Sequence, residues 1–226
     1  MDKEIKICGT QSILDLETAV TAGATAVGII CDRTRITRDT VNLHRADWFV
    51  RSTPNDVTSV LVPRLTEPGD LVDLAKRVRP DRIQLGENED PRLAEALFNL
   101  EDRPEIAQVF HISDHTTPAV MDDFMDFIDY THFDTFSEDR PGGTGQTHDL
   151  EVSREMTEAA HEAGKLALLA GGLTWRNVAR AIQIVRPNGV DVQTGIKDRY
   201  RSHDRELVVK FVEAASTAFQ AIEVVS

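Results

Sequence analysis

The chain of 226 residues is 41% apolar and carries a net charge of −13 at pH 7. This apolar fraction is enough for a hydrophobic core, whereas the acidic charge argues against a nucleic-acid partner, which requires a basic surface. No stretch approaches the roughly 20 apolar residues that a membrane helix needs. A charged N-terminal lead with a following apolar run, which would indicate a signal peptide, is also absent from the sequence.

The two cysteines, Cys8 and Cys31, each end a separate apolar run. Two cysteines in a chain of this length do not make a disulfide framework. We therefore expect a reduced, cytoplasmic protein that binds neither nucleic acid nor membrane. The acidic balance fits a high-salt cytoplasm and equally an ordinary acidic protein.

From the N-terminal end onwards, an apolar run, a turn and an amphipathic stretch follow one another eight times. The first amphipathic stretch, for example, spaces Ile13, Leu16 and Val20 as one face of a helix. The predicted strand and helix pairs are 4–9 with 12–22, 24–31 with 41–50, 57–62 with 71–78, 82–85 with 91–100, 106–112 with 118–127, 128–135 with 150–163, 166–170 with 175–185, and 189–194 with 204–222.

Eight alternating pairs without a break in composition predict an α/β fold, a single (β/α)8 TIM barrel of eight parallel strands that occupies residues 1–226 as one domain. The length is near the lower end of the range for such barrels. A doubly wound open sheet is the alternative, but a Gly-rich fingerprint does not follow the first predicted strand.

In a barrel, the C-terminal ends of all strands meet at one face, where these enzymes place their chemistry. This would bring Cys8, Asp134, the pair Gly171-Gly172 and Asp191 into one mouth. Because side chains alternate along a strand, Lys6 lies on the same face as Cys8, His132 on that of Asp134, and Gln193 on that of Asp191. We expect these polar faces to point into the barrel, since the opposite faces must pack on helices.

Cys8 and Asp134 are the candidate proton-transfer groups. A thiolate can act as a nucleophile or a base, although a free thiol has a pKa of about 8.5 and needs help from its surroundings. The alternative is that Cys8 is a small buried apolar residue. Asp134 follows an apolar strand and precedes the Gly-rich stretch 137–146, so that it could be a general acid in a site that this loop closes. Alternatively, it caps the following turn.

The glycines predict an anion site. Gly171-Gly172 would expose backbone N–H groups at a helix start, and loops after strands seven and eight of barrels often hold phosphate. Gly195 and Ile196, after the eighth strand, would complete this cradle. The alternative is a tight turn that requires positive φ.

Two other kinds of site are disfavoured. His111 and His115 have no third metal ligand nearby, which predicts no metal site. Lys165 stands at the start of a predicted strand, on the wrong side of the barrel for a Schiff base.

Four stretches, in this order and spacing, resemble the phosphoribosylanthranilate isomerase family of tryptophan biosynthesis over nearly the whole chain. They are Lys6-Ile7-Cys8-Gly9, residues 133–135 leading to 142–145, Leu169-Ala170-Gly171-Gly172-Leu173-Thr174, and Gly189-Val190-Asp191-Val192 with Gly195. The resemblance implies an Amadori rearrangement of a phosphorylated small-molecule substrate, without cofactor or metal, by a monomer or homodimer.

By the same resemblance, Asp134 is the general acid that protonates the ribose ring oxygen, and Cys8 is the general base that takes the C2′ proton. Gly171, Gly172, Gly195 and Ile196 would hold the phosphate. Asp191 would position the sugar, and Arg35 would meet the anthranilate carboxylate, with Arg38 as the other candidate.

The sequence departs from the family pattern in three places. Gln84-Leu85-Gly86-Glu87 replaces Gln-Leu-His-Gly, Gln193-Thr194 replaces a pair of serines, and Arg33-Thr34-Arg35 replaces Ser-Pro-Arg. These changes leave the acid and the base in place. They also leave open a paralogue that isomerises another phosphorylated sugar amine, or a non-catalytic binder of a phosphoribosyl ligand.

Overall fold

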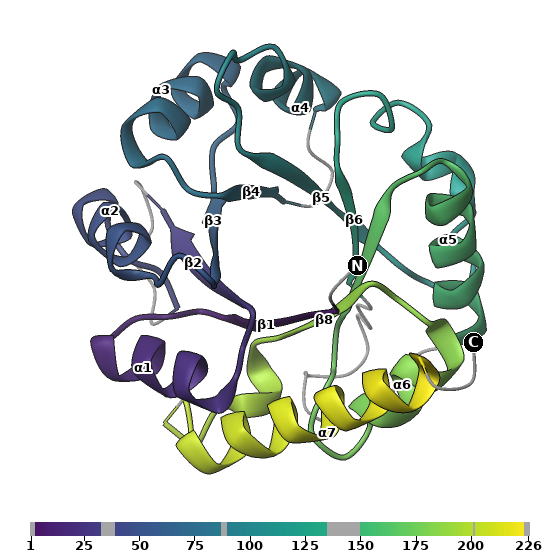
Figure 1. Ribbon diagram of the computed structural model, residues 1–226. Coiled ribbons are helices and arrows are strands. Elements are labelled where there is room, and N and C mark those ends of the chain that lie inside the picture. Colours follow the sequence, from purple (N-terminus) through teal and green to yellow (C-terminus); the bar gives the residue numbers. More distant parts are fainter. Residues whose placement is uncertain (1–2, 33–38, 87–89, 135–149, 201, 224–226) are drawn as a thin grey trace.

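A computed structural model describes residues 3–32, 39–86, 90–134, 150–200 and 202–223. Eight parallel strands close into a barrel in chain order, and β8 pairs with β1 (Figure 1). The strands are β1 (Glu4–Cys8), β2 (Ala26–Cys31), β3 (Thr58–Pro63), β4 (Arg82–Leu85), β5 (Glu105–His111), β6 (Tyr130–Asp134), β7 (Leu166–Ala170) and β8 (Gly189–Val192). The predicted parallel (β/α)8 barrel is confirmed.

Helices surround the barrel on the outside (Figure 1). They are α1 (Ile13–Ala22), α2 (Leu43–Ser52), α3 (Pro68–Val78), α4 (Pro91–Phe98), α5 (Leu150–Glu162), α6 (Val178–Val185) and α7 (Arg205–Glu223), with two short 3-10 helices, η1 (Pro118–Met121) and η2 (Thr194–Ile196). Local signals set several helix starts. Ser12 and Asp15, for example, form a reciprocal capping box before α1.

The predicted helix 118–127 is wrong, because the structure has only the 3-10 helix η1 there, followed by turns. Backbone N–H groups bond to carbonyls three residues back, from Phe124 to Met121 and from Phe127 to Phe124. Three aspartates within ten residues are poor helix formers. Met121 is buried, and Phe124, Met125 and Phe127 pack on the core while they stay only partly buried.

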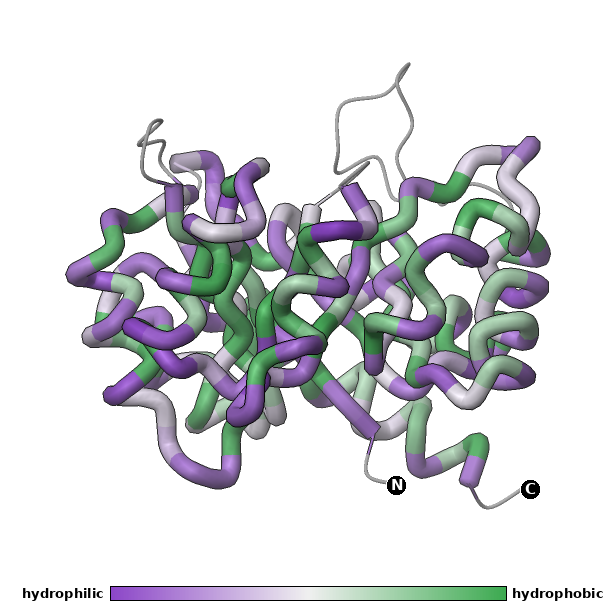
Figure 2. The backbone as a smooth tube through the Cα atoms, turned by 90° about the horizontal axis from the view of Figure 1, so that it is seen from above, coloured by the Kyte–Doolittle hydropathy of each residue, from purple (hydrophilic) through white to green (hydrophobic). Residues whose placement is uncertain are grey.

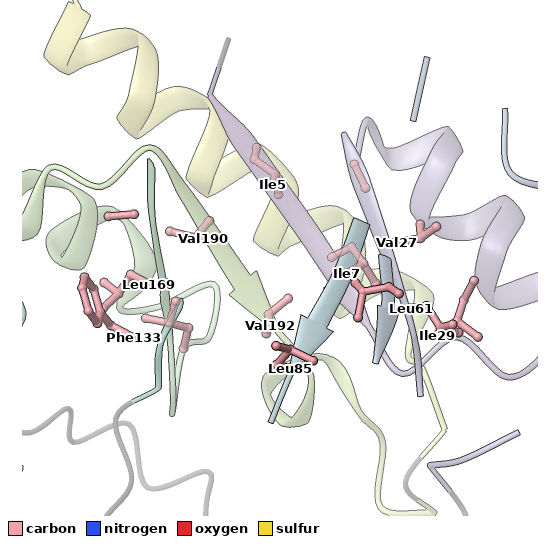
Figure 3. Packing of buried hydrophobic residues seen from close by; sticks show 14 of the residues in the cluster. Ile5, Ile7, Val27, Ile29, Leu61, Leu85, Phe133, Leu169, Val190 and Val192 are labelled. Atoms are coloured by element: carbon pink, nitrogen blue, oxygen red, sulfur yellow. The ribbon is translucent and has the colours of Figure 1, made fainter. Parts of the chain in front are cut away.

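Side chains alternate between the two faces of the strands. The outward faces form an apolar layer against the helices, which includes Ile5 and Ile7 of β1, Val27 and Ile29 of β2, and Phe133 of β6 (Figure 3). The intervening residues point into the barrel. Because apolar side chains occupy the outer face of the strands, the inner face is available for polar groups.

A buried arginine with two acidic partners closes the N-terminal end of the barrel. Nη1 of Arg82 lies 2.8 Å from Oε1 of Glu4, and its Nη2 lies 2.9 Å from Oε2 of Glu105. The guanidinium also stacks 3.6 Å from the ring centroid of Tyr130. The start of β1 and the end of α7 lie at this same end of the molecule (Figure 2). The opposite end, where the strands finish, is the mouth of the barrel.

Candidate active site

Cys8 is the last residue of β1 and is buried at the mouth. Its sulfur lies over Gly28 of β2, where a Cβ atom would stand 2.6 Å from Sγ. A glycine at this position of β2 therefore makes room for the thiol. On the backbone side, Nε2 of His203 lies 3.1 Å from the carbonyl oxygen of Cys8. Because a carbonyl can only accept, this nitrogen carries the proton.

Burial raises the pKa of the Cys8 thiol, and the charge of Lys6 opposes this effect only in part. Asp191 raises the pKa further, whereas Lys197 lowers it. Cys8 is therefore mainly a thiol at neutral pH, and its thiolate fraction increases as the pH rises.

A polar cluster lies beneath the thiol, inside the barrel. Nζ of Lys6 donates a hydrogen bond of 2.9 Å to Oδ2 of Asp191, and Nε2 of His132 lies 3.3 Å from the same oxygen. The register explains the ion pair, because Lys6 and Asp191 are direct partners on the adjacent strands β1 and β8. The predicted inward orientation of these polar residues is thus confirmed.

The two oxygens of Asp191 differ. Oδ2 accepts the hydrogen bond from Lys6 and lies next to Nε2 of His132. Oδ1, in contrast, is buried without a hydrogen-bond partner among the described residues. Burial by itself would raise the pKa of Asp191, but Lys6 and His132 hold it at about 2. The carboxylate is therefore ionised at neutral pH, and Oδ1 is an acceptor that a ligand hydroxyl could satisfy.

Asp134 ends β6 and is partly buried at the same mouth. Its backbone pairs with His111 of β5 and with Ala170 of β7. Asp134 lies on the same strand face as His132, two residues away, so that the carboxyl group lies one layer above the Lys6, His132 and Asp191 cluster. The Gly-rich stretch that follows, residues 137–146, lies outside the described residues.

The predicted phosphate loops come together. Gly171 and Gly172, after β7, have φ values of +84° and +59°, which are left-handed conformations that favour glycine. A Cβ atom on Gly195 would stand only 1.9 Å from the carbonyl oxygen of Leu173, so the loop after β7 packs directly on η2. Nδ2 of Asn177 donates to the carbonyl of Gly172 at 3.0 Å and fixes this loop.

The fourth cradle residue, Ile196, has a fully buried side chain in the apolar core. Its contribution to an anion site would therefore come from its backbone. The two turns bring exposed backbone of β7 and β8 to one side of the mouth, where a phosphate group could bind.

Lys197 is a residue of the mouth that the sequence reasoning missed. Its Nζ donates a hydrogen bond of 2.7 Å to Asp39, and it lies 3.7 Å from where a Cβ of Gly9 would be. The side chain is 5% exposed. The sequence does place this lysine two residues after Gly195, in the predicted anion site. However, no sequence motif indicates that its side chain lies near Gly9 at the end of β1.

Arg35 and Arg38, the candidates for the substrate carboxylate, lie outside the described residues. Where the structure can be described, His, Cys, Asp and Glu side chains do not gather in groups of three or more that could hold a metal ion. Similarly, in the described ranges, none of the helices is both long and apolar enough to span a membrane.

Comparison with known proteins shows the family to which this chain belongs. The sequence profile described as N-(5'-phosphoribosyl)anthranilate (PRA) isomerase matches residues 5–214. The chain belongs to the N-(5'-phosphoribosyl)anthranilate isomerase family.

Relatives in this isomerase family include N-(5'-phosphoribosyl)anthranilate isomerase of Natronomonas pharaonis, with 35% identity over 93% of this chain and 97% of the relative. The protein of the same name from Haloferax volcanii is 35% identical over 97% of this chain and 96% of its own. Phosphoribosyl anthranilate isomerase of Thermotoga maritima has a similar fold, with a TM-score of 0.78 and 24% identity over 96% of this chain and 100% of that structure.

Two departures from the family pattern can be located in this isomerase fold. Gly86, which stands where the family has His, directly follows the last residue of β4, and its carbonyl oxygen accepts a hydrogen bond of 2.7 Å from Nε2 of Gln108. The side chain of Gln193 reaches the turn after β1, where its Cγ lies 3.5 Å from the Cβ position of Gly9. Both changes thus border the mouth, and Cys8 and Asp134 keep their places at the strand ends.

Proposed function

We propose that this protein isomerises N-(5'-phosphoribosyl)anthranilate to the corresponding 1-deoxyribulose 5-phosphate aminoketose in tryptophan biosynthesis. Membership of the isomerase family over residues 5–214 carries this conclusion. The reaction is an Amadori rearrangement, which is redox-neutral and consists of proton transfers around a ring opening. It requires an acid, a base and a site for the phosphate.

The proposed acid is the carboxyl group of Asp134. It donates a proton to the ribose ring oxygen, the C1′–O bond breaks, and the electron pair of the aniline nitrogen forms an iminium ion. Cys8, as the thiolate, then takes the proton from C2′, which gives an enolamine that tautomerises to the ketone. The positions of both residues at the mouth support these roles.

The proposed binding groups surround this pair. Gly171, Gly172, Gly195 and the backbone of Ile196 hold the phosphate, as the packing of the β7 loop on η2 supports. Oδ1 of Asp191 accepts a hydrogen bond from a sugar hydroxyl, which would satisfy a buried oxygen that has no partner among the residues the structure describes.

Arg35, or Arg38 in its place, binds the anthranilate carboxylate. We further propose that the protein acts in the cytoplasm, as a monomer or homodimer.

The test is a fluorescence assay of the purified protein with freshly prepared N-(5'-phosphoribosyl)anthranilate, whose emission is lost on conversion. Turnover is the expected result. Turnover would be absent in a folded protein if the chain were only a binder of phosphoribosyl ligands.

A second candidate is an isomerase of another phosphorylated sugar amine, which the changes at Gly86 and Gln193 favour because both border the mouth. Complementation of a tryptophan auxotroph that lacks the isomerase separates the two functions. Growth supports the first function, and failure of a well-expressed protein to restore growth supports the second.

A further inference from the structure

Lys6 is buried in the middle of β1, with a side-chain exposure of 0%. Its neighbours on the outer face, Ile5 and Ile7, belong to the apolar core. A buried ammonium is costly unless opposite charge accompanies it. On the inner face, Lys6 meets one such group, the carboxylate of Asp191 at 2.9 Å, and the side chain of Cys8 becomes a second one when it is deprotonated.

This arrangement keeps Lys6 charged. Burial by itself lowers the pKa of Lys6, but Asp191 and Cys8 reverse this effect and leave the pKa above its usual value. The ammonium is therefore a fixed positive charge between the carboxylate and the sulfur. Lys6 contributes no proton transfer of its own at neutral pH.

The other charged and titratable groups around Cys8 come from several elements. Asp191 faces it from β8, and Nε2 of His132 on β6 lies 3.3 Å from Oδ2 of that carboxylate. Lys197 approaches from the segment after η2, and His203 bonds to the backbone oxygen of Cys8. Of the side-chain charges that act on the thiol, that of Lys6 has the largest effect.

We propose that Lys6 is a positioning residue, whose ammonium stabilises the thiolate of Cys8 and holds Oδ2 of Asp191 so that Oδ1 remains for the substrate. The inference deepens the proposed function of the same site. Without Lys6, deprotonation of Cys8 would place a second negative charge beside the Asp191 carboxylate, and only the smaller effect of Lys197 would oppose it.

The experiment is a titration of Cys8 by thiolate absorbance near 240 nm, which needs no substrate. It compares the parent protein with Lys6→Met, each corrected by subtraction of the same protein carrying Cys8→Ala. We expect the thiolate fraction of Lys6→Met at pH 8 to fall about tenfold, because an opposite charge within a few ångströms typically shifts a pKa by one unit or more.

The matched control is Lys3→Met. Lys3 precedes the same strand but lies at the other end of the barrel, where its Nζ donates to the carbonyl of Pro187. The titration of Cys8 is expected to stay at the parent value in this variant. A second variant, Lys6→Met with Asp191→Asn, removes both charges of the buried pair and avoids an uncompensated carboxylate if Lys6→Met does not fold.

In that double variant, the thiolate fraction is expected to lie between those of the parent and Lys6→Met, since the effect of Lys6 on Cys8 exceeds that of Asp191. A titration that is unchanged in the folded Lys6 variants would show a purely structural ion pair and overturn the proposal. A parent protein without turnover would instead refute the proposed function, because the titration does not depend on catalysis.

Discussion

Cys8 and Asp134 end strands that are separated by two others around the barrel, β7 and β8. A sugar phosphate held at the β7 and β8 loops would therefore lie between the thiol and the carboxyl group. This geometry suits a reaction in which the acid acts on the ring oxygen and the base acts on C2′, the carbon next to the C1′ atom that this oxygen leaves. Neither group alone distinguishes an enzyme from a binding protein, but the pair serves no purpose in simple binding.

The raised pKa of Cys8 has a direct kinetic consequence. Burial disfavours the thiolate, so that the thiolate fraction of Cys8, the proposed base, is small at neutral pH. We expect kcat/KM of Asp134→Asn, whose residual activity no longer requires a protonated carboxyl group, to rise with pH from neutral into the alkaline range until Cys8 is deprotonated. Steady-state rates measured across this range, at constant ionic strength, check the expectation. A rate of Asp134→Asn that is flat from neutral pH upwards would mean that Cys8 is not the base.

Asp191 makes stability depend on pH at the acidic end. Its pKa of about 2 in the folded protein lies below the ordinary value of 3.8. The corresponding stabilisation, about 2 kcal/mol, is present above the unfolded pKa and is lost as the pH falls through the folded value.

Urea unfolding of the parent protein and of Asp191→Asn, between neutral pH and about pH 3, measures this effect. The free energy of unfolding should fall more steeply for the parent below about pH 4. Parallel curves for the two proteins would show that Asp191 has an ordinary pKa in the fold.

At the scale of elements, the contact between the β7 loop and η2 depends on Gly195. A methyl group there would overlap with the carbonyl of Leu173, so Gly195→Ala should destabilise the protein by about 1–3 kcal/mol and raise KM for the phosphorylated substrate. The matched control is Gly69→Ala in α3, where a Cβ has no neighbour within 4 Å.

Gly69→Ala should leave KM unchanged and keep or increase stability by up to about 1 kcal/mol, because alanine is the better helix former. Chemical unfolding and substrate titration of both variants provide the comparison. An unchanged KM in a folded Gly195→Ala protein would contradict a phosphate site at this contact.

The strands were predictable from sequence because each combines an apolar outer face with turn residues at its ends. Arg82–Leu85 and Leu166–Ala170, for example, have the predicted limits. The stretch 118–127 was not predictable in the same way, since its apolar residues are spaced as in a helix while its aspartates favour turns. Apolar spacing reports which residues can be buried and not which backbone hydrogen bonds form.

The site was predictable in part. Strand ends brought Cys8, Asp134 and the glycines to one mouth, and alternation placed Lys6 with Cys8 inside the barrel. The bond between Lys6 and Asp191 depends on the register of β1 against β8, which joins residues 185 positions apart. Local patterns carry no information on that register, and for the same reason Lys197 was missed.

For the whole molecule, the two ends of the barrel have different roles. The N-terminal end is closed by Arg82 and its acidic partners, far from the mouth. Arg82→Met leaves Glu4 and Glu105 without their cation, so we expect a loss of about 3 kcal/mol in the free energy of unfolding. Because chemistry belongs to the opposite face, kcat should change little.

Unfolding in urea and steady-state kinetics on the same preparation separate these two effects. A large fall in kcat with unchanged stability would show that the N-terminal end takes part in catalysis. Loss of stability alone supports a division between a stabilising end and a catalytic end.

The most direct measurement of the central claim is the rate of isomerisation of N-(5'-phosphoribosyl)anthranilate by the parent protein, Cys8→Ala and Asp134→Asn, followed by fluorescence. We expect turnover by the parent and a decrease of about 10²- to 10⁴-fold in kcat for each variant, with substrate binding retained. A variant that is folded and turns over at the parent rate would show that its residue is neither the acid nor the base.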